Sequence, residues 1–220
     1  MTLLNKVHNQ FVLFLFQGEL PARKMPEILT TALLPIPKAL KNYETKDNAL
    51  RIKRILQDLK SVLNNKNPEY EVYPYQNDIG FWRVVMKGPL GGPYESGAWL
   101  IYVMFPIDYP FSPPEIRFET PILHCNINPY GKVCHSILGR NWTSDTNMFT
   151  VLNCVYGLLL FPETADPIDT LLAFQFFSNK AQYEKNIVEY IKNFSIKTFE
   201  KLKEEVEAKF VMEQEMPDVE

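Results

Sequence analysis

The sequence predicts an α+β domain in which one helix precedes an antiparallel sheet and several helices follow it. Three observations predict this order: an amphipathic helical pattern before residue 66, four short β-branched or aromatic segments between residues 70 and 118, and helical patterns from residue 149 onward. The short segments follow one another too closely for parallel crossovers, which need a dozen or more residues. We therefore expect a four-stranded antiparallel meander between the helices.

The first helix is expected over residues 49–65. Its apolar residues approximate one stripe: Leu50, Ile55, Leu56, Leu59 and Leu63. Its basic residues lie off this stripe: Arg51, Lys53, Arg54 and Lys60. Residues 1–48 contain short apolar stretches interrupted by glycine and proline. We treat residues 1–48 as an N-terminal extension of unknown role.

The four strands are expected at 70–73, 81–86, 99–105 and 115–118. Residues 119–146 are poor in strand formers and contain Pro121, Pro129, Gly131 and Gly139, so they predict an irregular loop. Cys134 lies within this loop.

The C-terminal part of the chain is expected to be helical. Pro162 and Pro167 separate the first two helices, because helix interiors reject proline. The main domain is expected to be 49–195, with a charged helical extension over 196–220. The expected helices cover 149–160, 167–177, 179–193 and about 196–210.

Composition narrows the function classes. The chain has 220 residues and a net charge of −3, without the basic footprint that nucleic acids demand, so no nucleic-acid partner is expected. Its longest apolar run near the N-terminus, 11–16, is too short to cross a bilayer. Three cysteines do not suggest a disulfide framework, so we expect an intracellular protein, cytoplasmic or nuclear.

The informative motif surrounds Cys134. Asn126 lies eight residues before this cysteine and Trp142 lies eight residues after it. A free cysteine is more often a small buried hydrophobe, which is the role expected for Cys125 and Cys154. The polar, glycine-flanked setting of Cys134 favours a reactive thiol instead.

These residues resemble the ubiquitin-conjugating enzyme family. The family has a His-Pro-Asn motif and a tryptophan at these same distances from its active cysteine, and here Cys125 replaces the proline. The resemblance runs from about Arg51 to Phe194, about two thirds of the chain. It includes Phe81-Trp82, Met86-Lys87-Gly88-Pro89, Pro93-Tyr94, Tyr109-Pro110-Phe111-Ser112-Pro113-Pro114, Asp166-Pro167 and Tyr183.

The resemblance implies a UBC-like fold and a chemical role. Cys134 would accept ubiquitin, or a ubiquitin-like modifier, from an activating enzyme as a thioester and pass it to a substrate amine or to a ligase. ATP is used by the activating enzyme, so this chain needs no cofactor. Two alternatives are a weak or inactive binding module of the same fold and a conjugating enzyme for another modifier.

The resemblance also assigns site roles. Asn126 stabilises the oxyanion or shapes the loop, and Asp166 orients an incoming lysine or caps a helix. His124 and Trp142 support the site. Ligase contact is assigned to Phe111, Thr143, Ser144 and Asp145, and activating-enzyme contact to Arg51, Lys53 and Arg54. For the three basic residues, an ordinary solvated face is the alternative.

Two departures from the family pattern affect the chemistry. His135-Ser136 follows the cysteine where many members have Leu-Asp, which leaves open whether lysine, cysteine or a hydroxyl is the acceptor. His124-Cys125 and Cys134-His135 offer four zinc ligands, but the two-residue separation of paired zinc ligands is absent, so no metal is expected. A cysteine hydrolase is disfavoured because no histidine is placed to act as its base.

Overall fold

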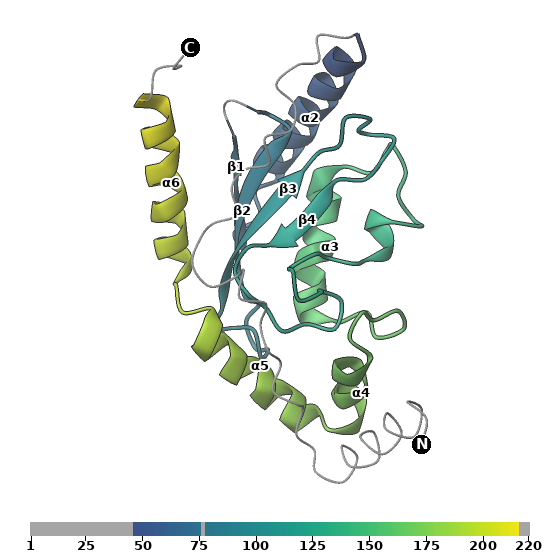
Figure 1. Cartoon of the computed structure of the whole chain (residues 1–220), viewed down its shortest axis with the longest axis vertical. Helices are drawn as coiled ribbons and strands as arrows, with labels where there is room; N and C mark the ends of the chain where they lie inside the picture. The colour runs from purple at the N-terminus through teal and green to yellow at the C-terminus, as the bar shows by residue number, and fades with distance from the viewer. Residues whose placement is uncertain (1–45, 76–77, 216–220) are drawn as a thin grey trace, which may run out of the picture.

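The computed structural model describes residues 46–75 and 78–215, so the predicted N-terminal extension lies outside the described residues except for 46–48. The predicted order of one helix, a four-stranded antiparallel sheet, an irregular loop and further helices is confirmed (Figure 1). The elements are α2 (Lys46–Asn65), β1 (Tyr70–Pro74), β2 (Phe81–Lys87), β3 (Ala98–Met104), β4 (Glu115–Phe118), the 3₁₀ helix η2 (Ser136–Leu138), α3 (Met148–Leu160), α4 (Thr170–Ser178), α5 (Lys180–Phe194) and α6 (Phe199–Glu215).

The sheet is a meander in the order β1-β2-β3-β4, and every neighbouring pair is antiparallel. Val84 lies opposite Ile101, and Val85 lies opposite Leu100. Side chains alternate between the two faces of a strand. These two pairs therefore point to opposite faces of the sheet.

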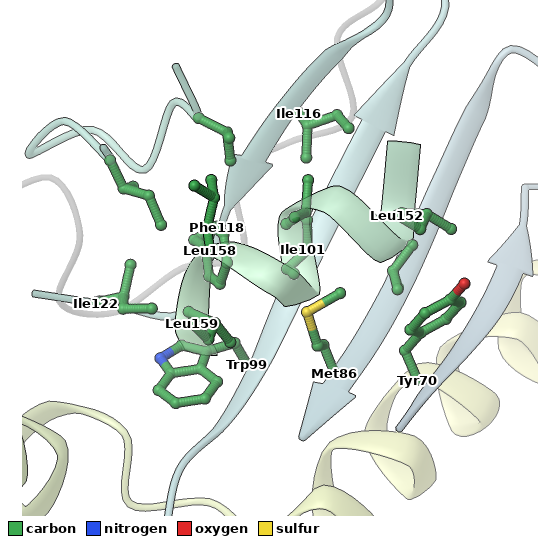
Figure 2. Close-up of a cluster of buried hydrophobic side chains, with 14 of the residues drawn as sticks. Tyr70, Met86, Trp99, Ile101, Ile116, Phe118, Ile122, Leu152, Leu158 and Leu159 are labelled. Carbon is green, nitrogen blue, oxygen red and sulfur yellow. The ribbon is translucent and has the colours of Figure 1, made fainter. Parts of the chain in front are cut away.

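One face of the sheet packs against α3 and forms the main core. Met86 and Ile101 on the strands and Leu152 and Leu158 on the helix are all buried in this cluster (Figure 2). Leu152 and Leu158 lie six residues apart, and α3 is apolar over most of its length. This packing holds α3 against the sheet.

The other face of the sheet is covered by α6. Phe199, Leu202 and Val206 are spaced three and four residues apart and bury Val85 and Leu100 in a second cluster. Figure 1 shows α6 and α3 on opposite sides of the sheet. The predicted charged extension is therefore helical, but its apolar side is docked on the sheet.

Capping residues set the starts of the later helices. Asp169 accepts a hydrogen bond from Leu172 N and caps α4, which begins at Thr170 and not at the predicted position 167. Asn147 caps α3 in the same way by accepting from Thr150 N. No helix within residues 46–75 and 78–215 is long and apolar enough to cross a membrane.

Candidate active site

Cys134 lies at the end of a short bridge between two parts of the irregular loop. Val133 pairs with Ile127 in an isolated antiparallel bridge, and Cys134 N donates to Asn126 O at 2.9 Å. Cys134 is exposed, whereas Cys125 is buried and burial raises its pKa to about 11. Cys154 on α3 is half-buried and not fully buried as expected, so Cys134 is the exposed one of the three cysteines.

A glycine lets the loop that carries Cys134 lie close against the end of β4. Gly131 has a φ of 79°, which side chains other than glycine rarely adopt. A Cβ at Gly131 would lie 2.0 Å from Phe118 O, so no side chain fits there. Phe118 N donates to Gly131 O at 2.9 Å, and this close approach holds the loop against the end of β4.

His124 is a neutral structural residue beneath the site. Its Nε2 lies 2.9 Å from Leu158 O, which can only accept, and its Nδ1 accepts from Asn126 N at 3.0 Å. Both contacts are satisfied by the neutral ring with its proton on Nε2. Burial lowers the pKa of His124 to about 4, so the ring carries no charge near neutrality. It therefore pins the loop to α3 instead of moving protons.

The side chain of Asn126 bonds to the loop that follows α3. We call residues 163–169 the acidic loop, because they include Glu163 and Asp166. Asn126 Oδ1 accepts from Glu163 N at 2.9 Å, and its Nδ2 donates to Glu163 O at 2.8 Å. Asn126 is also fully buried. Of the two roles considered for Asn126, this geometry supports the loop-shaping one, because Nδ2 donates to Glu163 O and also lies 3.5 Å from Asp166 O in the same loop.

The backbone of the same motif adds a second fastening. Cys125 O accepts hydrogen bonds from Ile168 N at 2.8 Å and from Asp169 N at 3.0 Å. The segment 163–169 is therefore held by residues 125 and 126 at both of its ends.

Asp166 lies on this fastened loop with an exposed carboxylate. Arg140 Nη1 lies 3.5 Å from Asp166 Oδ2, and Arg140 Nη2 lies 3.7 Å from Glu163 Oε1. The alternative helix-capping role for Asp166 is wrong, because Asp169 caps α4. The Asp166 carboxylate thus faces the segment that follows Cys134.

Trp142 joins the two loops that carry the predicted ligase-contact residues. Its Nε1 donates to Pro110 O at 2.9 Å, and its ring lies 5.9 Å from that of Tyr109. Phe111, next to Pro110, is 81% exposed. The other predicted contact residues, which follow Trp142 directly, are also exposed: Thr143, Ser144 and Asp145.

The predicted basic face of the first helix is only partly present. Arg51 is buried and donates to Pro106 O and Phe105 O, each at 2.8 Å. Arg54 donates to Asp58 at 2.9 Å, to Thr146 O at 2.6 Å and to Ser144 O. Lys53 is exposed. The assignment of Arg51 to an exposed surface is wrong, and Arg54 braces the loop 143–146.

The reason is a buried stripe on α2 that contains charged residues. Arg51, Ile55, Asp58 and Val62 recur at helical spacing and are all buried. Asp58 accepts from Tyr109 Oη at 2.6 Å and from Met148 N at 3.1 Å. Sequence reasoning missed Asp58, although an acid at this spacing among apolar residues is a signal for a buried, paired carboxylate.

Comparison with known proteins identifies the architecture. A family model described as "Ubiquitin-conjugating enzyme" matches residues 54–191. The chain belongs to the ubiquitin-conjugating enzyme family. The matched residues of this conjugating-enzyme domain include Cys134 and the acidic loop, whereas α6 lies outside them.

A curated relative agrees with this assignment. "Probable bifunctional E2/E3 enzyme R795" of Acanthamoeba polyphaga mimivirus is 40% identical over 186 residues. The aligned region is 84% of this chain and 14% of the relative, so the chain spans a small part of the relative's length.

Two residues of the candidate site do not stand out in the sequence: Glu163 and Arg140. Both lie in loops, where no periodic pattern indicates which side chains meet. Within the described ranges, no group of three or more His, Cys, Asp or Glu side chains is placed to hold a metal ion.

Proposed function

We propose that this chain accepts ubiquitin, or a ubiquitin-like modifier, from an activating enzyme as a thioester on Cys134. It then passes the modifier to a substrate amine or to a ligase. The observation that carries the proposal is an exposed Cys134 whose backbone is bonded to Asn126, the residue that also fastens the acidic loop. Membership in the conjugating-enzyme family supports the same reaction.

The chemistry needs little from the chain beyond an accessible thiolate and an ordered rim. The Cys134 sulfur attacks the carbonyl carbon of the modifier's thioester, a new C–S bond forms, and the activating enzyme's sulfur leaves as a thiolate. One thioester replaces another. ATP is consumed earlier, by the activating enzyme, so we propose no cofactor for this chain.

The surface around Phe111 is the proposed contact with a ligase. Phe111 is an exposed aromatic residue, of the kind enriched in protein interfaces. Residues 143–145 flank it, and Arg54 and Trp142 hold these loops from beneath. Lys53, which is exposed on α2, is the proposed contact with the activating enzyme.

The reaction is proposed for the reducing interior of the cell, in the cytoplasm or the nucleus. All three cysteines are free, which agrees with a reducing compartment. The relative's name joins conjugating and ligase activities. For this chain we propose the conjugating activity, because the family match covers residues 54–191.

The test is a charging assay with a panel of modifiers, each paired with its own activating enzyme and ATP. The proposal predicts an adduct that reducing agents remove, formed by the wild-type chain and absent from Cys134→Ala. An adduct with another modifier alone would identify a conjugating enzyme for that modifier. No adduct with any pair, from a folded protein, would favour an inactive binding module.

A further inference from the structure

A charged bridge crosses from the segment after Cys134 to the acidic loop. Arg140 contributes the cation and contacts two carboxylates, Asp166 at 3.5 Å and Glu163 at 3.7 Å. The Nε2 atom of His135 lies 3.6 Å from Glu163 Oε2. His135 and Arg140, which both follow Cys134 in the sequence, therefore contact carboxylates of one loop.

This bridge borders the candidate nucleophile. Asn126 O accepts from Cys134 N, while the Asn126 side chain binds the backbone of Glu163. One buried residue thus holds both the cysteine and the acidic loop. An acceptor that approaches Cys134 along this loop meets the Glu163 and Asp166 carboxylates at its rim.

The histidine adds a proton donor to the bridge. His135 Nδ1 accepts from Ile137 N at 3.1 Å and caps η2. With Nδ1 used as an acceptor, the ring proton lies on Nε2, which faces Glu163. The Arg140 guanidinium, which stays protonated at all relevant pH values, is the permanent cation of the bridge.

We propose that Arg140 is a specificity-determining residue for acyl transfer from Cys134. Its guanidinium occupies the two carboxylates that an acceptor ammonium would otherwise use. A cationic amine must therefore displace Arg140, whereas a neutral amine or a thiol need not. This inference rests on the proposed thioester function and names the class of acceptor that the site disfavours.

The bridge is weak enough to be displaced. The Arg140 and Asp166 side chains are 65% and 67% exposed. Both distances exceed the roughly 2.7–2.9 Å of a charge-assisted hydrogen bond. Exposed ion pairs of this kind contribute little free energy of stabilisation. Arg140 therefore competes with the acceptor without blocking it. We expect it to raise the apparent KM for lysine about two- to fivefold.

The transfer step itself balances without any further reagent. The lysine ammonium binds at the carboxylates and gives up one proton to a carboxylate or to water. Its neutral nitrogen attacks the thioester carbonyl carbon and a C–N bond forms. The nitrogen then releases its second proton to water, and the C–S bond breaks. The Cys134 sulfur leaves as a thiolate and regains a proton from water.

The experiment measures discharge of the pre-charged protein in single turnover onto three acceptors: free lysine, hydroxylamine and 2-mercaptoethanol, a thiol without an amino group. Hydroxylamine is an amine that is uncharged near neutral pH, so it separates charge from nucleophile type. For Arg140→Gln, the apparent KM for lysine should fall about two- to fivefold. The rates with hydroxylamine and 2-mercaptoethanol should stay unchanged, and Arg140→Lys should behave like the wild type.

Lys132→Gln is the matched control. Lys132 is exposed and lies two residues before Cys134. Its positive charge helps to lower the pKa of Glu115 on β4. Its loss removes the same charge near the cysteine without touching the bridge, so the lysine KM should not change.

Two results would overturn the inference. One is an unchanged or higher lysine KM in Arg140→Gln, and the other is an equal change with hydroxylamine, which would indicate a structural role. Both are read from protein that has already been charged. Failure to charge at all would instead refute the proposed function, so the two failures are distinguishable.

Discussion

Asn126 and Glu163 are joined by a reciprocal pair of hydrogen bonds, from Glu163 N to Oδ1 at 2.9 Å and from Nδ2 to Glu163 O at 2.8 Å. Asn126 is fully buried, so its amide cannot exchange these partners for water. The pair fixes the acidic loop relative to the loop segment that ends in Cys134. The orientation of Asp166 toward the site therefore depends on a residue that is not itself at the surface.

Replacing Asn126 by alanine should loosen this loop. Two backbone groups of Glu163 lose their partner, and we expect the free energy of unfolding to fall by about 1–3 kcal/mol. Charging of Cys134 should persist, because the thiol remains exposed, while discharge onto lysine should slow. Urea denaturation and a single-turnover discharge assay measure the two effects. An unchanged stability with lost discharge would instead assign Asn126 a direct role at the oxyanion.

His124 should make stability depend on pH. Its pKa is about 4 in the folded protein because of burial, against an ordinary value of 6.5. Between pH 6.5 and 4 the unfolded chain binds the proton and the folded chain does not, so stability falls as the pH falls. The loss from this group should reach about 3 kcal/mol across the window.

Urea denaturation at pH 7 and pH 5 measures this dependence. The difference between the two values should shrink in His124→Gln. An equal pH dependence in wild type and His124→Gln would contradict the assigned protonation state.

Asp58 should be among the most sensitive positions of α2. Its carboxylate accepts from Tyr109 Oη, Arg54 Nε and Met148 N, and it is buried. Asp58→Ala leaves these donors without a partner and should lower the free energy of unfolding by about 3 kcal/mol. Gln57→Ala, at an exposed neighbouring position, should change it by less than about 0.5 kcal/mol. Equal effects of the two substitutions in chemical denaturation would contradict the role of Asp58.

The C-terminal helix should contribute to the stability of the sheet. Phe199 is buried against the face that carries Val85 and Leu100, so Phe199→Ala should cost about 3 kcal/mol. Ile196→Ala should be nearly neutral, because Ile196 is 76% exposed just before the helix. Thermal and chemical unfolding measure both. A neutral Phe199→Ala would indicate that α6 does not remain docked in solution.

Much of the fold follows from local patterns in the sequence. The four strands carry alternating or continuous apolar residues between turn residues, and the observed bounds of β1 to β4 lie within a residue of the predicted ones. The docking of α6 was not predicted, although Phe199, Leu202 and Val206 show the spacing of an apolar stripe. Their stripe is narrow, and the many charges of this segment favoured a solvated helix.

The site was predictable as a motif but not as a network. The resemblance to the family singled out Asn126, Cys134 and Asp166, yet it did not show that Glu163 and Arg140 meet beside them. Contacts between loops depend on where the strands and helices place the loop ends, and no sequence period reports that placement. Arg51 was misassigned for a related reason, because backbone carbonyls that accept from a buried guanidinium leave no mark in the sequence.

The central claim is that Cys134 carries the modifier, and mapping the adduct tests it most directly. The charged protein should be digested without reductant and the modified peptide identified by mass spectrometry, for the wild type and for Cys125→Ser and Cys154→Ser. Our account predicts one thioester, on the peptide containing Cys134, in all three proteins. A thioester on Cys125 or Cys154, or an adduct that survives in Cys134→Ala, would contradict it.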